Sequence, residues 1–528
     1  MASEEVLRRT LHNADGKPFA KYANIKGAFA TEQFELIVDE VQGDRAGRSR
    51  MRVRVPMAKA GFPEGLRSGE SRTVALRDMI ARRFWESSRT HARSPIAGFE
   101  GGQVRMPRPG QEVIPRGCVQ VTDFYVEACF SAALPSKGNK VSEEAALELI
   151  FGRIALIASE SMFMSAYKSQ KAQAFVEAAE NADWIRAHLA ENGLAAFVAV
   201  GSVLPRREDG LAPMIDAEPF DCDGPLKVEM RVPNGPPIAG MGIPAGYTAV
   251  TGPTGSGKSS LADAVFAGVY NHIPGDGREY VVSDPDASLI VNEAGRLLGG
   301  RALSGPESGH AAVTEAVEAG SRLLVVDEDR CSPALVRRAF MSRGGGPALC
   351  ELGHSMGEKG VSLLMVTGDE RAVRMADTAI AMEGFRACRL EVGRLEGGAE
   401  FEVPPERRPV ARNVDFSKGR KEVSTAAPSL REVEVGELTV GVPAAGFLDQ
   451  CQTREAADAV AAARDLMDGS LTLREACERA IEKVESGDAA DGTGMAHARA
   501  RAVDVAAVLC RHPAMLFIER RRRRLLFP

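Results

Sequence analysis

Residues 252–259 combine glycines, a lysine and a serine at a spacing suited to phosphate chemistry. They read GPTGSGKS and fit the pattern G-x-x-x-x-G-K-[ST]. Glycines let the backbone curl so that its N–H groups point at phosphate oxygens, and a helix that begins at the lysine adds the positive end of its dipole. We expect Lys258 to reach the β- and γ-phosphates of a nucleotide and the Ser259 hydroxyl to bind Mg²⁺. The predicted nucleotide contacts are Gly252, Pro253, Thr254, Gly255, Ser256, Gly257, Lys258, Ser259 and Ser260.

Two acidic residues follow an apolar run further along the chain. Residues 323–326 read LLVV and end in Asp327 and Glu328. Such a run predicts a buried parallel strand, which would deliver Asp327 towards Mg²⁺ and Glu328 to an attacking water. Together with Lys258, Glu328 is the predicted catalytic residue, and the implied cofactors are ATP and Mg²⁺. The chemistry would be in-line attack of water on the γ-phosphate.

The elements around these motifs alternate between strand and helix. Short apolar runs predict strands, and segments with N-cap signals and polar faces predict helices. The expected strands are 247–251, 323–326, 361–367 and 378–382, and the expected helices are 259–270, 333–340 and 370–376. This alternation predicts a doubly wound α/β core. Upstream of it, period-two alternation predicts strands at 33–41 and 50–55, and Ser142 is expected to cap a helix.

A third motif lies between the first two. Ser304 and Gly305 open a helical stretch upstream of Asp327, and this looks like the ABC signature, in which a serine and backbone N–H groups bind the γ-phosphate held by another protomer. A plain Ser-Gly loop that caps a helix is an equally good interpretation of this motif alone.

A resemblance that extends along most of the chain favours the interpretation of Ser304 and Gly305 as an ABC signature. The chain resembles the predicted ABC-class ATPase family nearly end to end, and NHIPGDGRE at 271–279 is the most specific segment. The matching segments are 15–29, 38–56, 108–116, 240–252, 270–287, 315–329, 452–459 and 467–476.

The resemblance implies a domain order and an assembly. It implies an N-terminal α/β domain at 1–205, an ABC-type P-loop core at 206–410 and a mostly helical C-terminal region with a basic tail at 411–528. It also implies a homodimer with two composite ATP sites, in which Asp329 lies in a loop that crosses between protomers.

The chain departs from the ABC pattern at two places. We find no convincing glutamine between 287 and 303, where a glutamine loop belongs, and Asp284 or Asp286 is a weak substitute. The strand after Glu328 ends in Val366-Thr367-Gly368-Asp369 and lacks the usual switch histidine. Efficient turnover is therefore less secure than nucleotide binding.

Two arginine-rich segments are candidate contacts for RNA or another nucleic acid. Arg48, Arg50, Arg52 and Arg54 alternate along a predicted strand and share one face, and the last three are the candidate contacts. We favour an edge strand protected by charge over a polyanion site. A denser run near the end of the chain could bind nucleic acid or be a solvated tail. It consists of Arg520, Arg521, Arg522, Arg523 and Arg524.

Composition excludes several other classes of protein. The 528 residues are 44% hydrophobic and 26% charged, with a net charge of −6, so the chain is an ordinary globular protein and not a polycation. Nine cysteines without a C-x-x-C pair favour a reducing compartment. We find no leader and no apolar run of membrane-spanning length, and expect a soluble, intracellular protein with no membrane partner.

Three functions remain open at this stage. The first is a dimeric ATPase that hydrolyses ATP to drive a conformational change. The second is a nucleotide-gated clamp on nucleic acid with little hydrolysis, which the missing glutamine and histidine favour. The third is a hexameric ATPase of the secretion or traffic type, because GPTGSGKSS is typical of that group.

Overall fold

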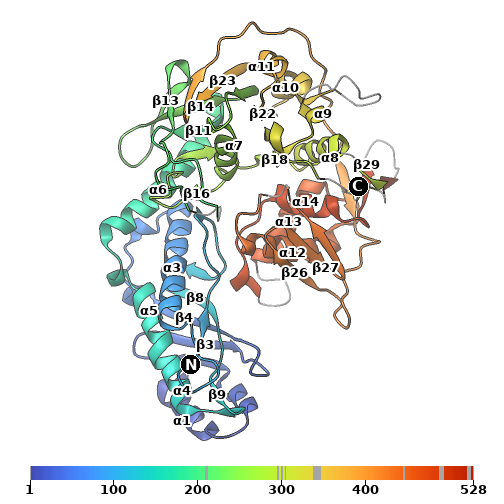
Figure 1. Cartoon of the computed structure of the whole chain (residues 1–528). Helices are drawn as coiled ribbons and strands as arrows, with labels where there is room; N and C mark the ends of the chain where they lie inside the picture. The colour runs from blue at the N-terminus through green and yellow to red at the C-terminus, as the bar shows by residue number, and fades with distance from the viewer. Residues whose placement is uncertain are drawn as a thin grey trace. The chain divides into compact units, whose positions relative to one another are not determined.

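The computed structural model folds into two compact units (Figure 1). One unit consists of Met1–Glu177 with Gly492–Ala498, and the other of Ala178–Asp491 with Arg499–Pro528. The structure describes residues 2–208, 212–293, 297–298, 301–303, 305–336, 347–443, 446–486, 493–519 and 525–526. Within these residues no helix is both long and apolar enough to cross a membrane.

The N-terminal unit is built on a largely antiparallel sheet. Its described strands lie in the order β1-β2-β3-β4-β8-β5, and β7 also pairs with β8. Their bounds are β1 Ala2–Ser3, β2 Gly27–Ala30, β3 Glu35–Glu40, β4 Ser49–Pro56, β5 Val104–Arg105, β7 Val119–Val121 and β8 Tyr125–Ala132. The predicted strands at 33–41 and 50–55 are therefore confirmed as β3 and β4. Alternation puts Met51 and Val53 into the core, where both are fully buried.

Helices cover the apolar face of this sheet. The longest, α3 (Glu70–His91), places Phe84 against Phe130 of β8 with ring centroids 5.2 Å apart. Ser142 caps the next helical stretch as expected, because its side chain accepts from the N–H of Ala145. The remaining helices are α1 Glu4–Ala14, α2 Met57–Ala60, α4 Glu143–Leu147, the π-helical turn Glu148–Ile154 and α5 Ala155–Ser161.

The second unit opens with an antiparallel sheet in the order β13-β14-β11-β17. Its strands are β11 Leu194–Ala199, β13 Lys227–Met230, β14 Ile238–Pro244 and β17 Val281–Ser283, and helix α6 (Ser169–His188) precedes them. Pairing with β14 and β17 places β11 with the P-loop part of the chain, before the boundary that we predicted at 205. Gly240 allows this pairing, because a Cβ there would lie 2.5 Å from the carbonyl oxygen of Val198.

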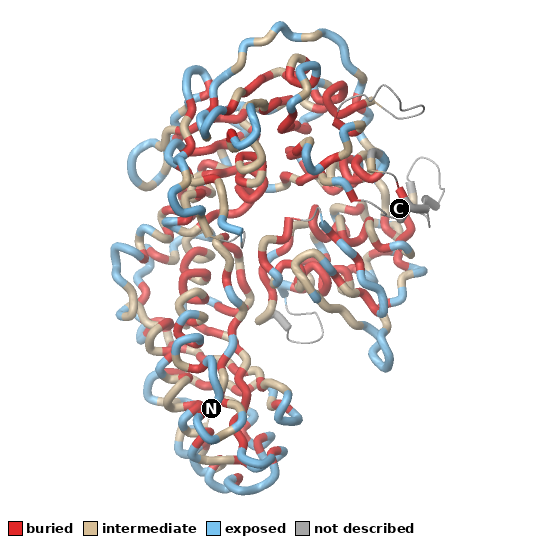
Figure 2. Tube along the Cα trace, in the orientation of Figure 1, coloured by how far each residue is buried: buried red, intermediate tan, exposed pale blue. Residues whose placement is uncertain are grey.

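A mostly parallel sheet forms the centre of this unit, and its middle strands are buried along their length (Figure 2). Its order is β12-β24-β23-β15-β22-β21-β18, and only β24 runs against its neighbour β23. The bounds are β12 Asp221–Cys222, β15 Tyr247–Thr251, β18 Ser288–Ile290, β21 Leu323–Asp327, β22 Ser362–Val366, β23 Thr378–Glu383 and β24 Arg386–Arg389. The strands predicted from apolar runs are thus confirmed, because a parallel sheet buries both faces.

The helices that connect these strands also follow the prediction. They are α7 Lys258–Ala267, α8 Gly305–Glu318, α9 Pro333–Val336, α10 Leu349–Glu358 and α11 Glu370–Met375. The predicted helix at 333–340 is confirmed in its first turn, and its remainder lies outside the described residues. The architecture is the mixed α/β fold that the sequence predicted.

The C-terminal part of the chain combines three helices with two small sheets. The helices are α12 Gln450–Ala462, α13 Leu473–Glu485 and α14 Ala502–Arg511, and capping boxes at Asp449 and Thr472 start the first two. The sheets add strands to the mostly helical region that we expected. They are β25-β29-β30 (Arg407–Val410, Leu516–Glu519, Leu525–Leu526) and β26-β27-β28 (Thr425–Ser429, Glu432–Val435, Leu438–Gly441).

A buried carboxyl in α12 makes the stability of this region depend on pH. Burial, followed by the nearby charge of Glu485, raises the pKa of Glu455 from its ordinary value of 4.5 to about 8. The folded state therefore keeps a proton that the unfolded state releases. The stabilisation is fully present below pH 4.5 and is lost as the pH rises to about 8. Each pH unit within this window lowers the free energy of unfolding by about 1.4 kcal/mol.

We expect Glu455→Gln to flatten this pH dependence and to stabilise the protein near pH 8. The amide oxygen can still accept the hydrogen bond from the N–H of Ala500. Urea unfolding at a series of pH values measures the slope, and Glu482→Gln on the exposed face of α13 is the control. The same slope in wild type and in the Glu455 variant would show that Glu455 titrates normally.

Candidate nucleotide-binding site

The predicted phosphate loop joins a central strand to a helix. β15 ends at Thr251, and α7 begins at Lys258, so residues 252–257 form the loop between them. Gly252, Gly255 and Gly257 have φ values of 144°, 80° and 95°, which glycine adopts without strain. The strand, loop and helix that the mechanism requires are therefore all present.

Two of these glycines are also required by close packing. A Cβ on Gly252 would lie 2.2 Å from the carbonyl oxygen of Met382, and one on Gly257 would lie 2.7 Å from the ring of Phe385. The N–H of Phe385 donates to the carbonyl of Ser256 at 3.1 Å. The turn between β23 and β24 therefore supports the loop from one side, and the shape of the loop is fixed by the fold.

Lys258 and the serines occupy the positions that phosphate binding needs. The Lys258 ammonium lies over the loop, where it donates to the carbonyls of Gly252 and Pro253 at 2.7 Å each. Ser259 and Ser260 lie in the first turn of α7, close to the positive end of the helix dipole. Pro253, Thr254 and Gly255 are exposed, so the outer side of the loop is open to solvent.

The acidic pair lies at the same edge of the sheet. Asp327 ends β21 and is buried, whereas Glu328 begins the following turn. The Glu328 carboxylate accepts from the Thr367 hydroxyl at 2.6 Å and from the N–H of Gly368 at 3.1 Å. Thr367 and Gly368, which follow β22 where a switch histidine was expected, thus hold the Glu328 carboxylate in one orientation.

The donor set fits a magnesium nucleotide. Asp327 Oδ2 and the Ser256 hydroxyl are buried, and neither has a hydrogen-bond partner among the described residues. An unsatisfied buried carboxylate oxygen is costly unless a cation or water meets it, and the nearest guanidinium nitrogen, Arg330 Nε, is 3.8 Å away. Asp327 and the Ser259 hydroxyl are therefore suited to hold Mg²⁺, whose preferred ligands are oxygens.

The structure also brings an amide to this edge that sequence reasoning missed. β18 runs parallel to β21 with Ile290 opposite Val326, so Asn292, two residues beyond the strand, lies level with Glu328. Its side chain is exposed, and its carbonyl oxygen accepts from the Ser308 hydroxyl of α8 at 3.4 Å. Asn292 thus provides an amide at this edge from the stretch 287–303, in which we found no convincing glutamine. The register between β18 and β21 identifies this position, and the sequence alone does not show that register.

The two predicted substitutes for the glutamine have other partners. The Asp284 carboxylate lies 3.3 Å from Arg322, and the Asp286 carboxylate lies 3.3 Å from Arg474 of the C-terminal part. Both carboxylates are thus engaged in ion pairs within the second unit.

Comparison with known proteins identifies the family. A model of the P-loop domain of ABC-class ATPases matches residues 168–305 and 300–396, and a model of the N-terminal domain of ATPases of the ABC class matches residues 4–165. The chain belongs to the ABC-class ATPase family. The resemblance seen in the sequence is therefore confirmed.

Individual relatives are more distant. An uncharacterized protein of Methanocaldococcus jannaschii is 26% identical over 247 residues, which is 40% of this chain, and the chain spans 55% of that protein's length. Among solved structures, cbiO1 from Clostridium perfringens, part of the ABC transporter complex cbiONQ, is 13% identical over 37% of this chain and 87% of its own, with a TM-score of 0.20. A nucleotide-free ATP-binding cassette of an ABC transporter is 11% identical over 38% and 92%, with a TM-score of 0.19. TM-scores this low support no argument about function.

The remaining predicted nucleotide contacts of this ATPase are Asp329, Gly305 and Ser304. Asp329 is exposed in the turn after Glu328, and its N–H donates to Asp327 Oδ1 at 3.2 Å. The next residue, Arg330, makes a bidentate ion pair with Asp263 of α7 at 2.5 and 2.7 Å, which ties this turn to the helix of the phosphate loop. Gly305 begins α8, and Ser304 lies outside the described residues.

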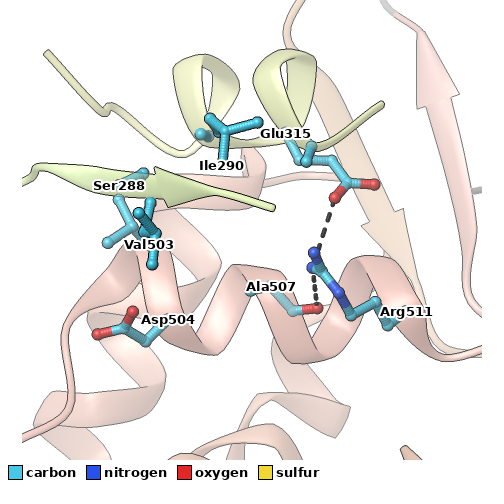
Figure 3. A pocket seen from close by; sticks show the side chains of 10 residues that line it. Ser288, Ile290, Glu315, Val503, Asp504, Ala507 and Arg511 are labelled. Carbon is cyan, nitrogen blue, oxygen red and sulfur yellow. Dashed lines mark hydrogen bonds and ion pairs between the residues drawn. The ribbon is translucent and has the colours of Figure 1, made fainter. Parts of the chain in front are cut away.

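Buried ion pairs join the C-terminal part of the ATPase to helix α8 and to the segment that follows β18. Arg511 of α14 contacts Glu293, with one N–O distance of 2.8 Å, and lies 3.5 Å from Glu315 of α8. Figure 3 shows Arg511 pointing from α14 towards Glu315, at one end of a small cavity. Arg407 of β25 pairs with Glu318 of α8 at 2.5 Å. The helix that follows the signature motif is thus held at two points.

The predicted nucleic-acid residues of β4 are paired with acids. Arg52 makes two bonds of 2.6 and 2.8 Å to Asp39, Arg54 lies 2.8 Å from Glu127, and Arg50 lies 3.9 Å from Glu40. The interpretation as an edge strand is wrong, because β4 lies between β3 and β8. The arginine face instead stabilises the sheet through cross-strand pairs. Residues Arg520, Arg521, Arg522, Arg523 and Arg524 lie outside the described residues.

The bond between Thr367 and Glu328 leads to a prediction for turnover. We expect Thr367→Val to lower kcat about tenfold or more, because Glu328 would lose the hydroxyl that fixes its orientation. ATP affinity should change little, and Thr367→Ser should restore most of the rate. Steady-state hydrolysis together with nucleotide titration separates the two effects. An unchanged kcat in the valine variant would rule out this role for Thr367.

Proposed function

We propose that this protein is a homodimeric ATPase that hydrolyses ATP to drive a conformational change. The observation that supports it best is the geometry of Glu328. The phosphate loop, Asp327 and Glu328 all lie at the carboxyl edge of one parallel sheet, and Glu328 is held by Thr367 and Gly368. A carboxylate held at that edge is placed to orient a water against the γ-phosphate.

Each residue has a definite part in this reaction. The loop N–H groups and Lys258 bind the phosphates and stabilise the charge that develops on them. Bound Mg²⁺, held by Ser259 and Asp327, would supply further positive charge at the transferring phosphoryl group. Glu328 accepts hydrogen bonds from Thr367 and Gly368 through Oε2, and these bonds would hold its carboxylate in place to orient the attacking water.

The open side of the phosphate loop supports the dimer. The loop residues 253–255 and Asp329 are exposed in one chain, so a second copy could bring Ser304 and Gly305 to the γ-phosphate. A composite site of this kind makes hydrolysis depend on residues of both chains.

A mixing experiment tests the composite site. Lys258→Ala and Ser304→Ala should each abolish turnover, because each damages both sites of a homodimer. In a mixed dimer of the two variants, however, one site combines an intact phosphate loop with an intact Ser304. We expect mixing to restore part of the wild-type rate. No recovery, with mixed dimers demonstrated by differential tagging, would contradict the composite site.

A nucleotide-gated clamp with little hydrolysis is the second candidate. It is favoured by Thr367, a neutral hydroxyl that cannot exchange a proton with Glu328 as an imidazole could. Turnover by the wild type separates the two, since a clamp binds ATP tightly without releasing phosphate. A hexamer of the secretion type would be recognised by its mass in solution. RNA or another nucleic acid remains a proposed partner, although the salt-bridged arginines of β4 no longer support it.

A further inference from the structure

Four arginines surround a pocket at the edge of the N-terminal sheet. The pocket has a volume of about 360 Å³ and lies between the last turns of α3 and the segment that contains β5. Its lining consists of Trp85, Ser88, Arg89, Arg93, Val104, Arg105, Met106 and Arg108. No carboxylate belongs to this lining, so the pocket concentrates positive charge.

The arginines have no acidic partner in the part of the chain that the structure describes. Two carboxylates on α3 and α5 are engaged elsewhere: Glu86 pairs with Arg83, and Glu160 pairs with His91. This differs sharply from β4 of the same sheet, where each arginine faces an acid. Unneutralised guanidinium groups repel one another, and an anionic ligand would relieve the repulsion.

A fifth arginine strengthens the positive field. Arg48 immediately precedes β4, and its Nη1 atom is buried without a hydrogen-bond partner among the described residues. Burial, followed by the charge of Arg105, lowers the pKa of the Arg48 guanidinium. A buried N–H group without a hydrogen-bond partner is costly, so the fold keeps this half-buried cation near Arg105 at a cost in stability.

Trp85 orders two of the guanidinium groups. The guanidinium carbons of Arg89 and Arg108 lie 5.1 and 5.6 Å from the centre of the indole ring, within cation–π distance. The ring thus restrains both side chains while their N–H groups stay free for a ligand. Guanidinium planes also stack well on nucleic-acid bases, and Val104 and Met106 add apolar atoms to the lining of the pocket.

We propose that this pocket binds a nucleotide unit, with the arginines on its phosphate and the aromatic and apolar surface under its base. The volume falls in the range of small-ligand sites. The unit could come from a free nucleotide or from a single strand. The proposal concerns a site distinct from the phosphate loop and does not depend on ATP hydrolysis.

Trp85 itself provides the measurement. The chain has two tryptophans, so Trp184→Phe leaves Trp85 as the sole indole reporter, and Lys258→Ala removes binding at the phosphate loop. Inorganic phosphate, uridine monophosphate and a short oligouridylate are titrated into this full-length protein. We expect saturable quenching by the two nucleotide probes. Equal affinities would identify a free nucleotide as the ligand, and affinity that rises with length would identify a strand.

Charge reversal tests the arginines. Arg89→Glu combined with Arg108→Glu should weaken binding at least about tenfold and reduce its salt dependence. Arg9→Glu with Lys21→Glu makes the same charge change at exposed positions away from the pocket and should leave affinity nearly unchanged. If the reversal variant does not fold, Arg89→Lys with Arg108→Lys keeps the charge, removes the planar fork and should bind more weakly than wild type.

Three results would overturn the proposal. One is the absence of saturable quenching by either nucleotide probe. Another is quenching that the Arg89 and Arg108 variants do not weaken. The third is equal quenching by a polyaspartate peptide, which would show a site for acidic protein segments and not for nucleotides.

Discussion

Replacing Glu328 with glutamine should lower kcat for ATP hydrolysis by about 10²- to 10⁴-fold while leaving ATP binding nearly intact. The amide oxygen can still accept from the Thr367 hydroxyl and the N–H of Gly368. The side chain therefore keeps its place and loses only its negative charge, which in the proposed mechanism orients and activates the attacking water.

Phosphate release and binding of a fluorescent ATP analogue, measured on the same preparations, separate chemistry from affinity. Glu370→Gln provides a matched control, because Glu370 lies on the exposed face of α11 and its side chain is 86% accessible. If the Glu328 variant turns over ATP at the wild-type rate, Glu328 does not act on water. If neither protein turns over ATP although both bind it, the protein is a clamp and Thr367 explains why.

The nucleotide site could be predicted largely from the sequence because its motifs are local. The phosphate loop needs a strand, a curled glycine segment and a helix in immediate succession, and all three can be recognised within 247–267. The apolar strands of the parallel sheet were equally readable. Asn292 was not, because its place beside Glu328 depends on the pairing of two strands far apart in the chain.

The N-terminal unit was harder to predict for two reasons. No helix was predicted where α3 lies, although Leu76, Met79, Ile80 and Phe84 follow helical spacing. The alternation of arginines on β4 was seen, but their partners Asp39 and Glu127 come from neighbouring strands. Sequence alone therefore could not separate the paired arginines from those that line the pocket.

A second large effect is expected at Arg511. Arg511→Met should destabilise the second unit by about 3–5 kcal/mol, because Glu293 and Glu315 would stay buried without their cation. Their side chains are only 6% and 8% accessible, so water cannot replace the guanidinium. Thermal or urea unfolding measures this loss. Arg464→Met, at an exposed position, is the control.

The same change tests whether the C-terminal part influences the nucleotide site. Glu293 follows Asn292 directly, and Glu315 belongs to α8, which begins at Gly305, so Arg511 contacts both segments that carry these candidate site residues. Adding Glu293→Gln and Glu315→Gln to Arg511→Met removes the unpaired charges and should restore much of the stability. If kcat of this triple variant is below the wild-type value although its stability is restored, the ion pairs position the catalytic elements. If kcat returns with stability, their role is structural support alone.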